Sequence, residues 1–62
     1  MTVPDYIEVN RTAHELAGRH GRSADQYAAK LAAEALAEGK TDEHAFWKAV
    51  EAALRVRNAE AQ

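Results

Sequence analysis

The chain is 62 residues long, 47 % of them hydrophobic, with a formal net charge of −2 at pH 7 and a pI near 5.8. This length allows one domain, and the charge provides no basic field that would attract nucleic acid or an anionic membrane. The chain has no Cys, which excludes disulfides and thiolate metal sites. No apolar run approaches the roughly 18 residues of a membrane helix, and the N-terminus lacks a signal-peptide pattern. We therefore expect a cytoplasmic protein with no membrane association.

The small number of large apolar residues predicts marginal stability. Ala accounts for 15 of the 62 residues, and a domain of this size buries only about 60 % of its unfolded surface. Small domains with so few large apolar residues gain stability from disulfides, a metal or a second subunit. Since disulfides are excluded, we expect self-association as a homodimer.

The first predicted helix covers residues 4–20. Pro4 takes an early position, where its missing amide costs nothing, and Gly21 follows as a left-handed stop. At about 100° per residue, one face carries Tyr6, Val9, Ala13, Leu16, Ala17 and His20. Ile7 lies off this face and is a candidate for a second contact surface. An extended segment over residues 3–9 is the alternative, because Val, Tyr and Ile favour strands, although the alternation fails at Tyr6 and Ile7.

The second predicted helix covers residues 24–38 and contains no Gly, Pro or β-branched residue. Ser23 and Gln26 have the spacing of a capping box at its start, and Gly39 is the expected left-handed residue after its end. The helical wheel places Tyr27, Leu31 and Ala35 on one stripe. Beside it lie Ala24, Ala28 and Ala32, with Leu36 at the far edge.

The third predicted helix covers residues 42–57, with Thr41 as its cap and a frayed tail over residues 58–62. Its apolar face carries Phe46, Ala49, Val50, Ala53 and Leu54. The residues expected to point away are His44, Lys48, Glu51 and Arg55. The fold class is therefore all-α, and we expect a single domain over residues 1–62, a compact three-helix bundle with short Gly-containing turns.

No residue pattern indicates catalysis or a bound cofactor. His14 and His20 are six positions apart, about 240° around a helix, so one helix cannot aim both at one metal ion. His44 could join either only through a particular packing. Ser23 and Thr41 are the nucleophile candidates best explained as caps, and no base stands at a suitable spacing. We expect no metal site, no cofactor, no small-molecule substrate and no enzymatic activity.

Phe46 and Trp47 are the strongest local feature. Two adjacent residues on a helix point about 100° apart, so Trp47 must lie at the rim of the core if Phe46 fills it. Trp47 then either closes the edge of the bundle or anchors an interface, as Trp and Tyr often do. Tyr27 carries the same two readings. The candidate interface residues are Trp47, Ile7, Tyr27 and Phe46.

A DNA-binding alternative rests on the stretch from His14 to Leu36. Leu16-Ala17 ahead of Gly21-Arg22-Ser23, followed by an Ala-rich helix, loosely resembles ribbon-helix-helix repressors and antitoxins. That family has an N-terminal strand with basic or amide residues, where this chain has Pro4, Asp5 and Glu8. The third helix also begins with acidic residues, the wrong charge for a helix that meets phosphates.

A second resemblance covers about residues 11–54. The spacing of His20-Gly21, Tyr27-Ala28, Gly39, Phe46-Trp47 and Leu54 resembles small uncharacterised helical proteins of proteobacteria. The resemblance implies an all-helical fold and a bacterial cytoplasmic setting, and it implies no activity or site residues. We therefore expect a small non-enzymatic interaction or regulatory module that presents its aromatic and apolar residues to a copy of itself or to another protein.

Overall fold

The computed structural model describes residues 5–60 and contains three α-helices and one turn of 3-10 helix. The elements in chain order are α1 (Tyr6–His20), η1 (Gly21–Ser23), α2 (Ala24–Ala37) and α3 (Thr41–Glu60). No strand occurs in this described range. The predicted all-α class is therefore confirmed for these residues.

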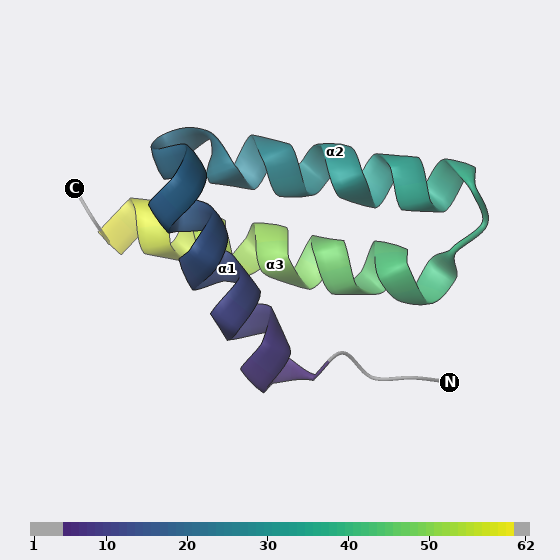
Figure 1. Cartoon of the computed structure of the whole chain (residues 1–62), viewed down its shortest axis with the longest axis horizontal. Coiled ribbons are helices and arrows are strands. Elements are labelled where there is room, and N and C mark those ends of the chain that lie inside the picture. Colours follow the sequence, from purple (N-terminus) through teal and green to yellow (C-terminus); the bar gives the residue numbers. More distant parts are fainter. Residues whose placement is uncertain (1–4, 61–62) are drawn as a thin grey trace.

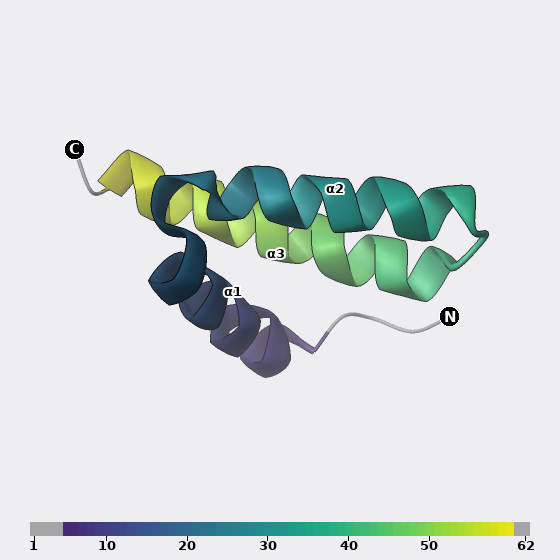
Figure 2. The ribbon, with the colours of Figure 1, turned by 45° about the horizontal axis from the view of Figure 1, so that its top comes forward.

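The helices form an antiparallel pair with a third helix across one end. Helices α2 and α3 run side by side in opposite directions (Figure 1). Helix α1 crosses α3 obliquely (Figures 1 and 2), and its residues from Val9 onward pack with Val50 and Leu54 of α3. In place of the expected compact three-helix bundle, the structure has a helical hairpin of α2 and α3 with α1 laid across part of it.

Helix α1 begins two residues later than predicted. Asp5 is its N-cap, and the Asp5 Oδ1 atom accepts a hydrogen bond from the Ile7 amide at 3.0 Å. Pro4, the predicted first residue, lies outside the described residues. Because Tyr6 to Val9 are helical, the extended alternative is wrong over those four positions, and its earlier part lies outside the described range.

The predicted Gly21 stop is confirmed, but the predicted capping box is wrong. Gly21 has a φ of 58° and donates its amide proton to the Ala17 carbonyl. Ser23 does not cap α2: its Oγ donates to the His20 carbonyl at 2.8 Å. The Ser23 backbone has φ −88° and ψ 3° because it closes the η1 turn, whereas an N-cap residue needs an extended backbone.

A tight turn joins α2 to α3. Gly39 has a φ of 76°, as predicted, and donates to the Leu36 carbonyl at 3.0 Å, while the Lys40 amide donates to the Ala35 carbonyl at 2.8 Å. These two bonds are those of a Schellman motif, which ends a helix by satisfying its last carbonyls. The Lys40 ammonium hydrogen-bonds Glu38 at 3.1 Å, which raises the pKa of Lys40, and nearby Glu43 adds to the effect.

Helix α3 starts earlier and ends later than predicted. Thr41 is its first residue rather than its cap, since the His44 amide donates to the Lys40 carbonyl at 2.9 Å. The helix continues to Glu60, so Asn58 to Glu60 are helical and not a frayed tail. Residues 61 and 62 lie outside the described range.

The core is built from few large side chains and many methyl groups. Helix α1 contributes Val9, Ala13 and Leu16, α2 contributes Ala24, Ala28, Ala32 and Ala35, and α3 contributes Val50 and Leu54. All four residues that α2 buries are Ala, so α3 can lie close against it. The large residues of α2 lie at the margins: Tyr27 is 40 % exposed, Leu36 is 56 % exposed and Leu31 is half-buried. Of the predicted stripe of Tyr27, Leu31 and Ala35, only Ala35 is buried, and it joins Ala24, Ala28 and Ala32 on the core face.

The stripe of α3 that was expected to face solvent runs beside α2. The half-buried His44 has its Nδ1 atom 2.9 Å from the Ala32 carbonyl, so this nitrogen donates the proton. Glu51 is only 4 % exposed, and its two oxygens meet the Lys48 Nζ at 3.0 Å and the Arg55 guanidinium at 2.7 Å. Arg55 also lies 3.8 Å from Asp25 of α2. The methyl-sized residues of α2 leave room for these polar groups.

Candidate interaction surfaces

Phe46 and Trp47 form an edge-to-face pair on the α2–α3 hairpin. Their ring centroids are 5.1 Å apart with an interplanar angle of 79°, an arrangement that aromatic rings favour. Both side chains are half-buried and pack against the core cluster. Packing alone accounts for the burial of Trp47, and its role as an interface anchor stays a prediction.

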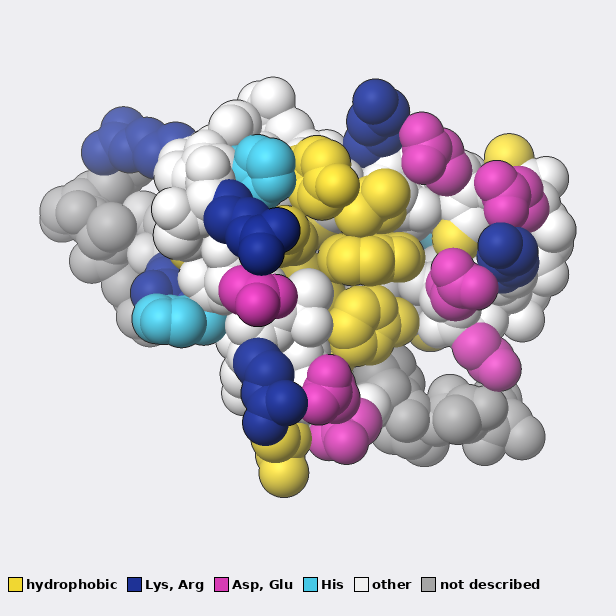
Figure 3. All heavy atoms as spheres, in the orientation of Figure 1, with side chains coloured by type: hydrophobic (Ala, Val, Ile, Leu, Met, Phe, Trp, Pro, Cys, Tyr) yellow, Lys and Arg dark blue, Asp and Glu magenta, His cyan; other side chains and the backbone are white. Residues whose placement is uncertain are grey.

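Tyr27 links the start of α2 to the end of α1. Its ring stacks on the ring of His20, with centroids 4.4 Å apart and an interplanar angle of 19°. His20 is exposed and does not lie on the core face where the helical wheel placed it. Figure 3 shows hydrophobic side chains gathered over α2 and α3, beside the place where α1 crosses them. We call Tyr27, Phe46 and Trp47 the aromatic face.

An apolar groove runs between α1 and α3 on a different surface. It has a volume of about 270 Å³ and is lined by Tyr6, Val9, Asn10, Ala49, Ala52, Ala53 and Val56. Tyr6 is 65 % exposed and Val56 is 59 % exposed. We call this the α1–α3 groove; it shares no residue with the aromatic face.

Two exposed residues of the α1–α3 groove, Tyr6 and Val56, were not predicted to lie at a contact surface. The helical wheel placed Tyr6 on the core face, but α1 crosses α3 at an angle (Figure 2), and Tyr6 remains 65 % exposed while Val9 is buried. Val56 is not among the residues predicted for the apolar face of the third helix. Ile7, the predicted second contact surface, is 74 % exposed and follows Tyr6 directly. The angle at which α1 crosses α3 determines that these side chains are exposed. That angle cannot be read from the periodicity of a single helix.

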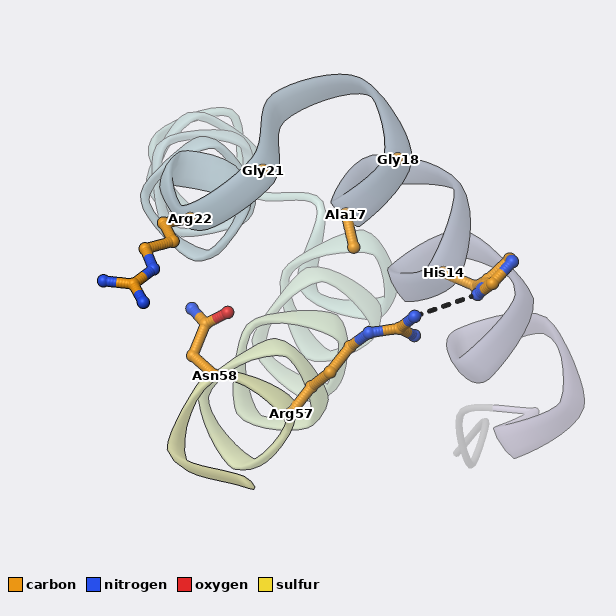
Figure 4. Close-up of a pocket in the computed structure, with 7 residues that line it drawn as sticks. All are labelled: His14, Ala17, Gly18, Gly21, Arg22, Arg57 and Asn58. Atoms are coloured by element: carbon orange, nitrogen blue, oxygen red, sulfur yellow. Dashed lines mark hydrogen bonds between the residues drawn. The ribbon is translucent and has the colours of Figure 1, made fainter. Parts of the chain in front are cut away.

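A polar pocket lies where α1, η1 and the end of α3 meet. Its volume is about 330 Å³, and it is lined by His14, Ala17, Gly18, Gly21, Arg22, Arg57 and Asn58. The Arg57 guanidinium lies 3.2 Å from the His14 Nδ1 atom (Figure 4). We call this the arginine pocket. Its residues come from chain segments about forty positions apart, which is why no local sequence pattern revealed it.

The histidines occupy three separate environments. His14 contacts Arg57, His20 stacks on Tyr27, and His44 is bonded to Ala32. Over residues 5–60, no group of three or more His, Cys, Asp or Glu side chains is placed to hold a metal ion.

Comparisons of the chain with models of protein families, with curated proteins and with solved structures gave no match. Among the helices of the described residues, none combines the length and the apolar content that a membrane crossing requires.

Proposed function

We propose that this protein is a small non-enzymatic interaction module that binds a second copy of itself through the α1–α3 groove. The observation that carries the proposal is the exposure of Tyr6 and Val56, more than half of each side chain, at a groove whose lining is apolar except for Asn10. Exposed apolar side chains that gather around a groove are typical of protein-binding surfaces. Ile7 extends the apolar surface beyond Tyr6.

A second copy is the occupant that the energetics favour. Among the described residues, Leu54, Val9 and Val50 are the only large side chains that are fully buried, so burial at an interface would add a large fraction to the stability of the fold. A two-fold dimer brings the same patch of both copies together, and the groove can then receive Tyr6, Ile7 or Val56 of its mate. A standard interface buries about 800 Å² per partner, a substantial share of the 4496 Å² surface of one chain.

The aromatic face is a second candidate surface, suited to contact with another protein. Trp47, Phe46 and Tyr27 lie there, and Tyr27 retains 40 % exposure. The cytoplasm of a bacterium is the setting we propose, on the resemblance to small helical proteobacterial proteins. The DNA-binding alternative has little support, because Tyr6 to Val9, which would have to be extended, belong to α1.

The experiment is a measurement of solution mass by sedimentation over a wide concentration range. The native chain should shift from monomer to dimer, and Val56→Lys should move that shift to at least about tenfold higher concentration, since it places a charge in an apolar contact. Leu36→Lys is the matched control, because Leu36 of α2 is 56 % exposed and lies outside the groove. A native chain that stays monomeric, or a control that acts like Val56→Lys, would contradict the proposal.

Trp47→Ala separates the two surfaces in the same experiment. If dimerisation uses the groove, this variant should unfold more easily because a packed ring is lost, yet its folded fraction should still dimerise. Dimerisation that disappears in folded Trp47→Ala would instead assign the interface to the aromatic face.

A further inference from the structure

The arginine pocket carries an excess of positive charge that the rest of the chain does not neutralise. Arg22 and Arg57 line it, and no Asp or Glu does. Four other cations, Arg11, Lys40, Lys48 and Arg55, each lie within 4 Å of a carboxylate. Among residues 5–59, whose side chains the structure describes, Arg22 and Arg57 take part in no such ion pair, and neither do Arg19 and Lys30, which lie outside the pocket. Two unpaired guanidinium groups in one pocket are notable in a chain whose net charge is −2.

The polar groups of the pocket are mostly donors. Arg57 turns toward α1 and donates to His14 Nδ1 at 3.2 Å, so this ring nitrogen is the acceptor (Figure 4). Arg22 lies on the other side of the pocket, beyond the Asn58 side chain, and its guanidinium points away from Arg57 (Figure 4). Arg22 is exposed, and exposed side chains change rotamer within nanoseconds. It can therefore turn toward an anion that enters beside Asn58.

The wall beside these donors is open. Ala17, Gly18 and Gly21 form it, and a Cβ atom added at Gly18 or at Gly21 would have no atom within 4 Å. A small molecule can therefore approach the backbone closely here. The volume of about 330 Å³ exceeds that of an inorganic anion and leaves space for a short organic group.

We propose that the arginine pocket binds the phosphate group of a small molecule. A guanidinium group presents a planar fork of N–H donors that matches phosphate oxygens. Two guanidinium groups balance the charge of close to −2 that a phosphate monoester carries at pH 7, and the Asn58 amide supplies a further donor. The pocket shares no residue with the α1–α3 groove, so the proposed phosphate site does not depend on the proposed dimer surface.

The test is a titration of the native protein at constant ionic strength, followed by NMR shifts of the backbone amides. The probes are inorganic phosphate and glycerol 2-phosphate, with sodium chloride as the blank. We expect saturable shifts at Gly18, Gly21 and Asn58. Arg22→Gln and Arg57→Gln should each weaken binding about tenfold, the effect of losing one charge-assisted hydrogen bond.

Arg19→Gln is the matched control. Arg19 is exposed on α1 and does not line the pocket, so this variant removes the same charge and should bind as the native chain does. Equal weakening by Arg19→Gln would show a general charge effect and overturn the proposal, as would the absence of saturable shifts with both probes. Tighter binding of glycerol 2-phosphate would identify a phosphate ester as the ligand, and equal binding would identify free phosphate.

Val56→Lys keeps this test distinct from that of the proposed dimer. The variant should bind phosphate with native affinity whether or not it dimerises, because Val56 is not part of the pocket. Circular dichroism of each variant, compared with the native helical signal, confirms that the protein titrated is folded.

Discussion

Two glycines of this chain have opposite structural roles. Gly39 has a φ of 76° and ends α2, a conformation in which a side chain is strained, whereas Gly18 lies within α1. A Cβ atom added at Gly18 would meet no other atom within 4 Å. The first glycine is therefore required by the backbone, and the second weakens its helix.

Gly18→Ala should stabilise the protein by up to about 1 kcal/mol, since Ala is the better helix former and restricts the unfolded chain. Gly39→Ala should destabilise it by about 1 kcal/mol or more, because Ala is strained at positive φ. Thermal unfolding followed by circular dichroism checks both, with shifts of several degrees in opposite directions expected for a domain of this size. A lower midpoint for Gly18→Ala would mean that the glycine has a role the packing does not explain.

At the scale of the elements, the contact between α2 and α3 is part apolar and part polar. Leu54 and Val50 meet the core, while Glu51 is almost fully buried between two cations. A buried carboxylate is tolerated only when its oxygens are paired. Since Arg55 also reaches Asp25 of α2, this cluster of side chains fixes how α3 is turned about its own axis.

Glu51→Gln should lower the free energy of unfolding by about 1–2 kcal/mol. The amide nearly keeps the shape but leaves Lys48 and Arg55 without their carboxylate, and both cations are more than half exposed, which limits the loss. Glu34→Gln on α2 is the control and should change little, because Glu34 is exposed. Urea unfolding of the two variants measures the difference, and equal midpoints would show that the buried carboxylate adds no stability.

At the scale of the whole molecule, the sequence predicts the helices better than it predicts their faces. The ends of α1 and α2 follow from local chemistry, as Gly21 and Gly39 show, whereas the predicted caps at Ser23 and Thr41 do not form. The buried face of α2 does not, because its Ala residues have too little size to mark a core by pattern alone. The helical wheel placed Tyr27, Leu31 and Ala35 on one stripe and Glu51 in solvent, whereas the structure buries Glu51 together with Ala24, Ala28, Ala32 and Ala35 of α2.

The candidate surfaces depend on this same arrangement. Ile7 is exposed as predicted, but the groove beside it requires α1 to cross α3 at an angle. The arginine pocket unites His14 and Arg57 from opposite ends of the chain. Neither juxtaposition has a local signal, because each results from the docking of α1.

The placement of α1 across one end of the hairpin also implies an order of assembly. Helices α2 and α3 are joined by a short turn, so their contacts close small loops, whereas α1 reaches α3 residues such as Arg57 that lie far along the chain. Closing the longer loop costs more entropy. We therefore expect α1 to dock last and to open first, with its amide protons exchanging with deuterium faster than those in the middle of α2 and α3. Uniform exchange across the three helices would instead indicate one cooperative unit. The groove and the pocket that α1 forms with α3 would then be present for as long as the protein is folded.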